Sequence, residues 1–502
     1  MRTVKVVLAT SEAVPFAKTG GLADVCGALP KELAAIGHHP MVVMPAYRSI
    51  YRAGVQIDPT GIQLSIPIGR KNVDGRLLFG HFPGSDVPVY FVDQPNYFDR
   101  EELYQTGGRD FPDNCERFVF FSRAVLEAVR LLGIEVDILH VNDWQTGLVP
   151  AYHKIEYRSV PGLDRAASLL TVHNLAFQGT FWHWDMLLTG FDWKYFNWNQ
   201  MEFFGQLNLL KTGLVFADAI NTVSPRYAEE IQSPPLGCGL EGVLQQRRSV
   251  LSGIINGVDY SQWNPEVDTA LPAKYGPGDV REGKAKCRSA LQREFNLPLD
   301  NSAPVVAFVG RLTEQKGVDL ISSVIQEWVH STNVQWVILG TGDLKYQEQL
   351  QMLSQRHPQK VSLKLEFSER LAHLVEAGAD MFLMPSRFEP CGLSQLYSLK
   401  YGTVPIVRAT GGLVDTVTNT TDESLASGTA TGFSFHDYSA FALGETLRRA
   451  VALYNRRDVW DRIVLAGMKH DWSWKRSARE YTALYEKMLA QVRTPQKAAA
   501  AT

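Results

Sequence analysis

Cysteine, excess charge and long apolar runs are all scarce in this chain of 502 residues. Its five cysteines are dispersed, odd in number and form no C-x-x-C pair, which is typical of a protein from a reducing compartment. No apolar run approaches the ~18 residues that a membrane-spanning helix needs. No leader peptide with an apolar centre precedes the first strand pattern. We therefore expect a cytoplasmic protein with no membrane partner.

Signatures of metal and nucleotide binding are missing as well. The twelve histidines form no H-E-x-x-H motif and no cluster with cysteine at the spacing of a metal site. The sequence has no G-x-x-x-x-G-K-[ST] loop, and no G-x-G-x-x-G follows the first strand pattern. The net charge of -3 gives no general reason to expect DNA or RNA as a partner. We predict no metal, no bound cofactor and no nucleic-acid partner.

What the chain does contain is a regular alternation of short apolar runs with segments of helical period. It is too long for a single hydrophobic core, and its hydrophobic content of 45% is that of a globular protein. The apolar runs are continuous, which indicates parallel sheets buried on both faces. The expected strands are residues 4–9, 40–44, 87–92, 136–141, 168–172 and 219–223 in the first half, and 305–309, 335–339, 361–365, 381–384 and 404–407 in the second. The predicted fold class is α/β, with two doubly wound Rossmann-like domains facing across a cleft.

A stretch rich in proline and glycine, from about residue 264 to 303, indicates the domain junction. We place the N-terminal domain at 1–263 and the C-terminal domain at 264–476, with a helix over 284–295 on the second domain. A helix over 477–490 is expected to pack back on the first domain.

The first expected helix, over residues 22–36, follows the first strand of the chain. Its apolar residues recur at helical spacing, and Gly37 is placed to cap its C-terminus. Pro30 lies inside the pattern and predicts a kink or an early break, because proline lacks the N–H that a helix needs.

Two turns that follow a predicted strand combine glycine with a cation. Lys18 precedes Gly20 and Gly21 early in the chain, and Arg311 and Lys316 lie in the segment from Gly310 to Gly317. Glycine lets backbone N–H groups approach an anion, and the cations add full charge. An isolated glycine pair is more often only a tight turn, and exposed cations are often only solvated. With one such turn in each half, the pattern favours a phosphate-bearing ligand held between two domains.

Polar residues also end other predicted strands. Asp143 and Trp144 follow the fourth strand, and His173 and Asn174 follow the fifth. Singly such residues are more often caps or core side chains, but at two adjacent strand ends they favour a carbohydrate contact surface. Glu389, after the fourth strand of the second half, precedes small residues and suits recognition of sugar hydroxyls beside a phosphate. A helix-capping role for this glutamate is the alternative.

Taken together, these segments resemble the ADP-glucose-dependent glycogen and starch synthases, retaining glucosyltransferases of the two-Rossmann-domain (GT-B) fold. The resemblance spans nearly the whole chain, and KTGGLAD and FEPCGL are its most specific parts. The matching segments, in order, are KTGGLADV (18–25), VNDWQTGL (141–148), TVHNLAFQG (171–179), NGVD (256–259), GRLTEQKG (310–317), PSRFEPCGLSQ (385–395) and TGGLVDTV (410–417).

The resemblance implies transfer of glucose from ADP-glucose to the non-reducing 4-hydroxyl end of an α-1,4-glucan, with retained configuration and no metal. Glycogen, starch-like polymers and maltooligosaccharides would be acceptors, and ADP the product. The implied catalytic residues are Lys18, Asp143, His173, Arg311, Lys316 and Glu389. The implied substrate-binding residues are Lys18, Gly20, Gly21, Asp24, Trp144, Asn174, Asn256, Cys391, Gly392, Leu393 and Ser394. Because these residues divide between two domains, we expect the cleft to close during the reaction.

Two positions depart from the pattern of related transferases. Many retaining enzymes of this fold carry a second glutamate eight residues after the first, and this chain has Tyr397 there, which agrees with the synthase branch. The segment 365–369 replaces a more usual Gly-Tyr-Asp-Glu, so the resemblance assigns no residue to the nucleotide base. The rival functions are a glucan phosphorylase-like enzyme, which would need pyridoxal phosphate, and a non-catalytic two-lobed sugar-binding protein. The choice between ADP-glucose and UDP-glucose stays open.

Overall fold

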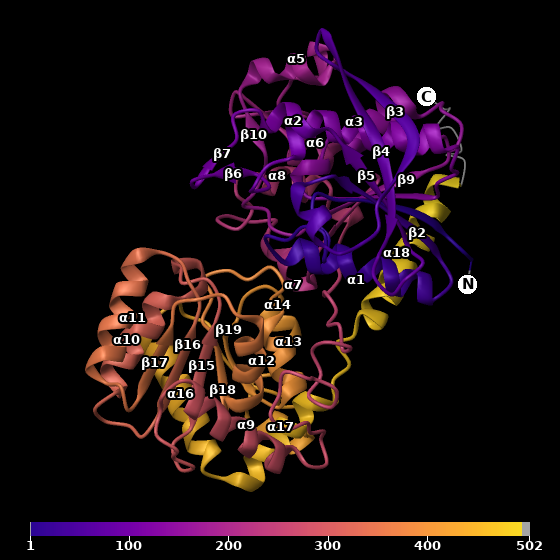
Figure 1. Ribbon diagram of the computed structural model, residues 1–502. Coiled ribbons are helices and arrows are strands. Elements are labelled where there is room, and N and C mark those ends of the chain that lie inside the picture. Colours follow the sequence, from indigo (N-terminus) through magenta and orange to yellow (C-terminus); the bar gives the residue numbers. More distant parts are fainter. Residues whose placement is uncertain (1, 494–502) are drawn as a thin grey trace, which may run out of the picture. The chain divides into compact units, whose positions relative to one another are not determined.

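The computed structural model describes residues 2–493, which form two units (Figure 1). The N-terminal unit comprises the chain up to Gly257 and again from Trp474, and the C-terminal unit comprises Val258–Ser473. At the crossings the Val258 N–H donates to the Trp472 carbonyl over 2.7 Å, and Gly257 packs on Trp474. The division therefore falls a few residues earlier than the sequence-based boundaries at 263/264 and 476/477.

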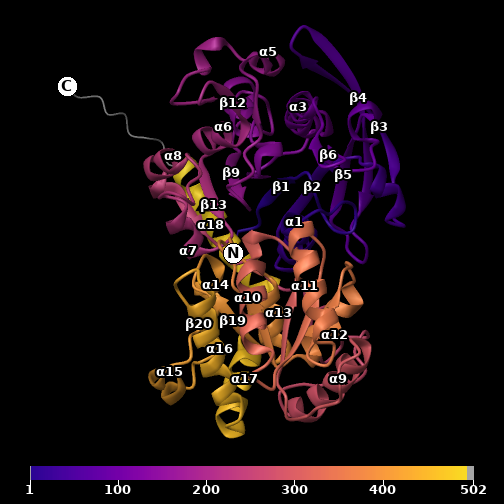
Figure 2. The same ribbon diagram turned by 90° about the vertical axis from the view of Figure 1, so that its left-hand side faces the viewer.

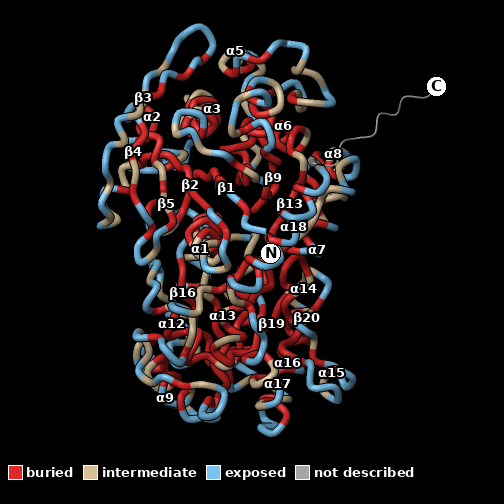
Figure 3. Tube along the Cα trace, turned by 90° about the vertical axis from the view of Figure 1, so that its right-hand side faces the viewer, coloured by how far each residue is buried: buried red, intermediate tan, exposed pale blue. Residues whose placement is uncertain are grey.

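A nine-stranded sheet forms the centre of the N-terminal unit, in the order β14-β13-β9-β8-β1-β2-β5-β4-β3. The chain winds outward from β1 in both directions, so the sheet is doubly wound and Rossmann-like, as predicted. Strands β1, β2 and β9 are largely buried (Figure 3). The strands are β1 (Lys5–Ala9), β2 (His39–Pro45), β3 (Asp58–Ile68), β4 (Lys71–His81), β5 (Pro88–Asp93), β8 (Ile138–Asn142), β9 (Ala167–Val172), β13 (Ala219–Thr222) and β14 (Leu251–Gly253).

The sheet is not purely parallel, because β3 and β4 form an antiparallel hairpin at one edge. The sequence does not predict this hairpin. Its strands alternate between exposed and more buried residues, and β3 contains Pro59, Gly61 and Pro67, residues that normally argue against a strand. An edge position tolerates them because an edge strand leaves half of its N–H groups unpaired.

Five further short strands and several helices complete the N-terminal unit as the structure describes it. The short strands are β6 (Gln105–Thr106), β7 (Arg109–Asp110), β10 (Thr180–Phe181), β11 (Glu202–Phe203) and β12 (Gln206–Asn208). The helices are α1 (Gly21–Ala35), α2 (Pro95–Phe98), α3 (Asn114–Leu132), α4 (Val149–Tyr152), α5 (Met186–Thr189), α6 (Leu209–Phe216), α7 (Pro225–Glu230), α8 (Glu241–Gln246) and α18 (Trp474–Arg493).

Helix α1 corrects one expectation and confirms another. It runs through Pro30 without interruption, and Gly37 follows the C-cap residue Ile36 at a φ of 93°, the conformation of a helix-capping glycine. Proline costs a helix interior about 3 kcal/mol. Here the helix buries Leu22, Val25 and other apolar residues, so tertiary packing outweighs the local preference.

The C-terminal helix α18 belongs to the N-terminal unit and begins at Trp474, earlier than the expected residue 477. It packs against α1 and β9. The Thr482 hydroxyl lies 2.9 Å from Nε2 of His38, and the Tyr485 hydroxyl lies 2.8 Å from Nδ1 of His140. These buried polar contacts fix the helix across the sheet.

The C-terminal unit contains a six-stranded parallel sheet in the order β17-β16-β15-β18-β19-β20. This order is again doubly wound, with the switch point between β15 and β18, and confirms the predicted fold. The strands are β15 (Val305–Val309), β16 (Gln335–Leu339), β17 (Val361–Lys364), β18 (Met381–Met384), β19 (Val404–Arg408) and β20 (Phe433–Phe435).

Helices cover both faces of this sheet (Figure 2). They are α9 (Val280–Glu294), α10 (Val318–Trp328), α11 (Leu344–Arg356), α12 (Glu369–Gly378), α13 (Ser394–Tyr401), α14 (Gly412–Thr416), α15 (Asp422–Ser427), α16 (Ala440–Tyr454) and α17 (Arg457–Lys469). The predicted helix over 284–295 is α9, which starts one turn earlier, at Val280.

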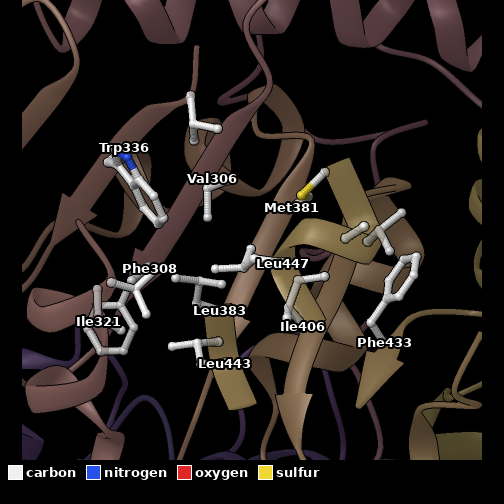
Figure 4. Packing of buried hydrophobic residues seen from close by; sticks show 14 of the residues in the cluster. Val306, Phe308, Ile321, Trp336, Met381, Leu383, Ile406, Phe433, Leu443 and Leu447 are labelled. Carbon is white, nitrogen blue, oxygen red and sulfur yellow. The ribbon is translucent and has the colours of Figure 1, made fainter. Parts of the chain in front are cut away.

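Alternate residues of each central strand enter two separate cores. Val306 and Phe308 of β15 lie in one cluster with Trp336 and Ile406 (Figure 4). Val305 and Ala307 of the same strand lie in the other cluster. Because both faces are covered, the strands are apolar throughout, which is why their sequence predicts them so well.

Candidate functional site

A buried carboxylate organises the first glycine turn. Glu12, only 3% exposed, accepts hydrogen bonds from the Thr19 N–H (2.5 Å), the Thr19 hydroxyl (2.6 Å) and the Gly20 N–H (3.3 Å). The Tyr104 hydroxyl donates a fourth bond over 2.7 Å. A charged acceptor with four donors fixes the loop between β1 and α1 more firmly than neutral bonds would.

The N–H groups of Thr19 and Gly20 therefore face Glu12. The N–H groups of Gly21 and Leu22, at the start of α1, have no acceptor among residues 2–493. A Cβ at Gly20 or Gly21 would meet no protein atom within 4 Å. The protein's own packing therefore does not explain the two glycines, whereas close approach by an anion at a helix N-terminus does.

The cation of this turn has a partner of its own. Lys18 Nζ lies 2.7 Å from the Asp24 carboxylate, and half of the lysine side chain is exposed. Both residues of the pair were predicted to bind substrate. The ion pair holds the Lys18 ammonium beside Asp24 in the first turn of α1. An exposed pair of this kind is weak and can open to admit an anion.

A second cluster lies where β8 and β9 end. The Asp143 carboxylate accepts from the His173 N–H over 2.7 Å and also from the Asn174 N–H. His173 Nε2 lies 2.9 Å from Oδ1 of Asn142, whose Nδ2 donates to the Ala9 carbonyl. The imidazole therefore donates through Nε2, which leaves Nδ1 as an acceptor.

Burial sets the charge states of this cluster. It raises the pKa of Asp143 to about 7, although the two backbone N–H groups oppose the shift. Burial also lowers the pKa of His173 to about 3, so the ring is neutral at pH 7. Asp143 has a φ of 55°, an uncommon conformation for a non-glycine residue at a strand end. Strain and a shifted pKa in one residue are typical of a functional position.

Trp144 connects the two clusters of the N-terminal unit. Its ring packs between Phe118 (4.9 Å) and Phe181 (5.7 Å), and lies 6.3 Å from the ring of Tyr104, the residue that donates to Glu12. Little of the indole is exposed. The structure thus gives Trp144 a packing position beside the site.

Among residues 2–493, no hydrogen bond links the side chain of Asn256, which follows β14, to either of those clusters. Its side-chain oxygen is buried and has no hydrogen-bond partner within residues 2–493. A buried amide oxygen without a partner is costly unless a ligand supplies a donor.

In the C-terminal unit, Lys316 and Glu389 are in direct contact. Lys316 Nζ lies 2.6 Å from Oε2 of Glu389, and the Ser386 hydroxyl donates to the same oxygen over 3.0 Å. Glu389 is 6% exposed, whereas the lysine side chain is 23% exposed. These bonds hold Glu389 as a charged acceptor rather than as a helix cap, since α13 has Leu393 at its N-cap and no side-chain cap bond.

The other residues of the second glycine turn contribute side chains more than amides. The Gly310 and Gly317 N–H groups are used by carbonyls of Leu339 and Glu314. Arg311 is exposed and has no carboxylate partner in the part of the chain that the structure describes. The turn therefore offers an anion the guanidinium of Arg311 and the ammonium of Lys316.

The loop from Cys391 to Ser394 presents backbone donors. The N–H groups of Gly392, Leu393 and Ser394 have no acceptor within residues 2–493, and α13 begins at Ser394. Gln395 fixes the loop by donating to the carbonyls of Cys391 (3.0 Å) and Gly392 (3.1 Å). Three free amides at a helix start form a ready anion or hydroxyl site.

Glycines of the TGGLVDTV motif explain themselves by close packing against this loop. A Cβ at Gly411 would lie 2.0 Å from the Glu389 carbonyl, and one at Gly412 would lie 2.2 Å from the Cys391 carbonyl. Close packing on the backbone of Glu389 and Cys391 therefore explains both glycines.

Three residues of interest are not identified from the sequence. Glu12 and Tyr104 act through the first turn, and Phe367 lies in the loop after β17. Phe367 is 90% exposed, the highest value among the large apolar residues described. Phe367 could have been identified from the sequence as an aromatic residue that closely follows a predicted strand. Glu12 carries no signal, because its bonds join residues that only the fold brings together.

No helix within residues 2–493 is both long and apolar enough to cross a membrane. The same residues contain no group of three or more His, Cys, Asp or Glu side chains arranged to hold a metal ion.

Comparison with known proteins gives matches to both halves of the chain. Residues 5–246 match the starch synthase catalytic domain family, and residues 292–463 match glycosyl transferases group 1. A glycogen synthase from Rhodopirellula baltica is 45% identical over 97% of this chain and 98% of its own length. One from Syntrophotalea carbinolica is 44% identical over 96% and 99%. The solved catalytic domain of starch synthase IV from Arabidopsis thaliana, bound to ADP and acarbose, superposes with a TM-score of 0.89 at 31% identity, covering 97% of this chain and 100% of that domain.

Proposed function

The chain belongs to the glycogen and starch synthase family of glycosyltransferases, and we propose that it transfers glucose from ADP-glucose to the non-reducing 4-hydroxyl of an α-1,4-glucan with retained configuration. Family membership gives the glucan synthase activity. The donor nucleotide and the stereochemistry are the finer part of the proposal. ADP bound to the starch synthase IV domain supports an adenine nucleotide as the leaving group.

The observation that carries the proposal is the grouping of cations and free amides around Glu389. Cleavage of a glycosyl phosphate builds negative charge on the departing diphosphate and positive charge on the sugar carbon. Arg311, Lys316 and the amides of residues 392–394 supply fixed positive groups for the first of these. Glu389, held by Lys316 and Ser386, supplies an acceptor for glucose hydroxyls.

In the N-terminal unit the proposed roles follow the same chemistry. Lys18 and the Gly21 N–H bind phosphate oxygens. The Nδ1 atom of neutral His173 and the unpartnered Oδ1 of Asn256 accept from sugar hydroxyls. Asp143, whose pKa is raised to about 7 by burial, stands beside His173 and can exchange a proton near neutral pH.

The test of the proposed function is release of nucleotide with a defined acceptor. The purified chain, incubated with maltotetraose and either ADP-glucose or UDP-glucose, should release ADP much faster than UDP and lengthen the acceptor. An absorbance band of bound pyridoxal phosphate, with glucose 1-phosphate as product, would support the phosphorylase-like alternative. If the protein releases nucleotide from neither ADP-glucose nor UDP-glucose, the result would support the binding-protein alternative.

Substitution of Phe367 by alanine should raise the KM for the nucleotide sugar about tenfold and change kcat little. The ring is exposed on the loop after β17, at the same sheet edge as Arg311 and Glu389, and we propose that it stacks on the nucleotide base. Stacking of a base on an aromatic side chain contributes about 1–3 kcal/mol. Steady-state kinetics with Phe367→Ala and Phe367→Tyr measure this, and the tyrosine variant should stay near the parent. If Phe367→Ala has the same KM for the nucleotide sugar as the parent protein, Phe367 does not stack on the base.

Activity should survive removal of divalent metal ions. Arg311 and Lys316 can neutralise the leaving diphosphate, the task that a metal has in other transferases. The measurement is the initial rate after dialysis against EDTA, compared with the rate after readdition of Mg²⁺ or Mn²⁺. A loss of activity that either ion restores would contradict this prediction.

A further inference from the structure

The segment that carries Lys316 has little support of its own. It is a single 3₁₀ turn, Glu314–Lys316, between β15 and α10, and we call it the Lys316 turn. Its N-cap residue, Thr313, has a buried hydroxyl without a hydrogen-bond partner within residues 2–493, so the turn lacks a side-chain cap. Short 3₁₀ turns have poorer hydrogen-bond geometry than an α-helix. The position of the Lys316 ammonium therefore depends on contacts from other segments.

One such contact comes from Arg387, which belongs to the loop of residues 385–389, called here the Glu389 loop. The Arg387 N–H donates to the Gln315 carbonyl over 2.8 Å, and Nη2 lies 2.6 Å from Oε1 of Glu314. The two charged side chains are 49% and 53% exposed. An ion pair this exposed is weak unless further contacts fix its geometry.

Tyr438, between β20 and α16, supplies further contacts to both segments. Its ring lies under the Arg387 guanidinium, whose central carbon is 4.1 Å from the ring centroid. Its hydroxyl donates to Oδ1 of Asp319 over 2.7 Å and lies 3.0 Å from the carbonyl oxygen of Glu314. Burial raises the pKa of this hydroxyl, and the Asp319 carboxylate raises it further, so the hydroxyl stays a donor. One side chain therefore contacts the Lys316 turn, the start of α10 and the Glu389 loop.

The backbone that presents Tyr438 is itself fixed. Arg408, at the end of β19, donates through Nε to the His436 carbonyl over 3.1 Å and through Nη1 to the Arg387 carbonyl over 2.7 Å. On the other side of Tyr438, the Ser439 side chain caps the N-terminus of α16. A side chain on so well anchored a backbone can place neighbouring groups precisely.

A purely structural role is the alternative for Tyr438. The residue is partly buried and packs against the hydrophobic cluster that contains Val306, so it also contributes to stability. An apolar side chain would satisfy that contact, whereas the hydroxyl and the face of the ring both meet polar groups of the Lys316 turn and the Glu389 loop. The test must therefore separate positioning from stability.

We propose that Tyr438 is a positioning residue for the transfer reaction, because it fixes the Lys316 turn against the Glu389 loop and so holds the Lys316 ammonium in place. This inference rests on the proposed function, in which that ammonium meets the departing diphosphate. A displacement of about 1 Å at a reacting group can lower a rate ~100-fold. Because Tyr438 acts through Lys316, its removal should have little further effect once the ammonium is gone.

The experiment is a double-mutant cycle in the full-length protein. Tyr438→Ala removes the ring and the hydroxyl, Tyr438→Phe removes the hydroxyl alone, and each is made in the parent and in Lys316→Ala. Phe441→Ala, a change at an aromatic residue near the start of α16 that is 74% exposed, is the matched control. The measurements are kcat with nucleotide sugar and maltotetraose, ADP affinity by calorimetry, and the melting temperature.

In the parent, Tyr438→Ala should lower kcat about tenfold, and Tyr438→Phe should lie between that variant and the parent. In the Lys316→Ala background, each change at Tyr438 should alter kcat less than about twofold. Phe441→Ala should match the parent throughout. Tyr438→Phe keeps the ring and its packing, so it decides the question if Tyr438→Ala does not fold. Equal losses in the two backgrounds, or parent kcat in Tyr438→Phe and in a folded Tyr438→Ala, would overturn the proposal.

ADP binding keeps this test separate from that of the proposed function. If the parent binds ADP but releases nucleotide from neither donor, the proposed function fails. The positioning role then stands if Tyr438→Ala weakens ADP binding in the parent but not in Lys316→Ala, and it is overturned if both backgrounds or neither are affected. A parent that neither binds ADP nor releases nucleotide would overturn both proposals.

Discussion

Replacing Lys316 by alanine should lower kcat by about two orders of magnitude. The ammonium lies 2.6 Å from the Glu389 carboxylate, and we propose that it also meets the diphosphate as charge develops on it. Loss of one such fixed group costs a transition state about 3 kcal/mol. The effect should fall on kcat more than on KM, because the charge grows during bond cleavage. Steady-state kinetics with saturating glucan measure it.

Two matched variants separate the chemistry from structural damage. Lys316→Arg keeps a cation and should retain more activity than Lys316→Ala. Arg311→Ala removes an exposed guanidinium with no carboxylate partner in the described part of the chain, so it should reduce kcat similarly and leave the melting temperature unchanged. Turnover at the parent level in Lys316→Ala would contradict the assigned role.

The strands were predictable from the sequence where burial of both faces requires every residue of the strand to be apolar. Strands β15, β16 and β18 begin and end at the predicted residues, because both of their faces are buried and the whole strand must be apolar. The β3–β4 hairpin was not predictable, since one of its faces is exposed and its proline and glycine residues imitate a loop. The prediction of a break at Pro30 was wrong because it considered only the local preference of proline, which the tertiary packing of α1 overrides.

The site likewise contains residues that the sequence identified and one that it could not. Lys316 and Glu389 were identified from short motifs, and their contact follows from the meeting of two strand ends at the switch point of the sheet. The role of Glu12 was not identifiable. Its partners Thr19 and Tyr104 lie at unrelated distances along the chain, and the donors that surround it exist only once the loops are folded.

Substitution of Glu12 by glutamine should reduce kcat/KM for the donor by about one to two orders of magnitude. The Thr19 and Gly20 N–H groups bond to one carboxylate oxygen, and the Thr19 and Tyr104 hydroxyls bond to the other. In the variant the amide oxygen must serve the two N–H groups, the hydroxyls must turn to accept from the amide nitrogen, and the charge that strengthens all four bonds is lost. A hydrogen bond to a charged group contributes about 1.5–3 kcal/mol, and a buried donor left without an acceptor adds to the loss. We expect the turn from Lys18 to Gly21 to lose its fixed position.

A double-mutant cycle with Tyr104→Phe distinguishes positioning from general destabilisation. Tyr104→Phe alone removes one of the four donors, so its effect on kcat/KM should be near 1 kcal/mol, or about fivefold. In Glu12→Gln the hydrogen bond with Tyr104 has already lost its charge, so removing the Tyr104 hydroxyl as well should cost little more. The double variant should therefore lose less activity than the sum of the two single losses, a departure from additivity that a merely unstable protein would not show. Additive losses, or a fall in melting temperature that accounts for the rate, would assign Glu12 to stability alone.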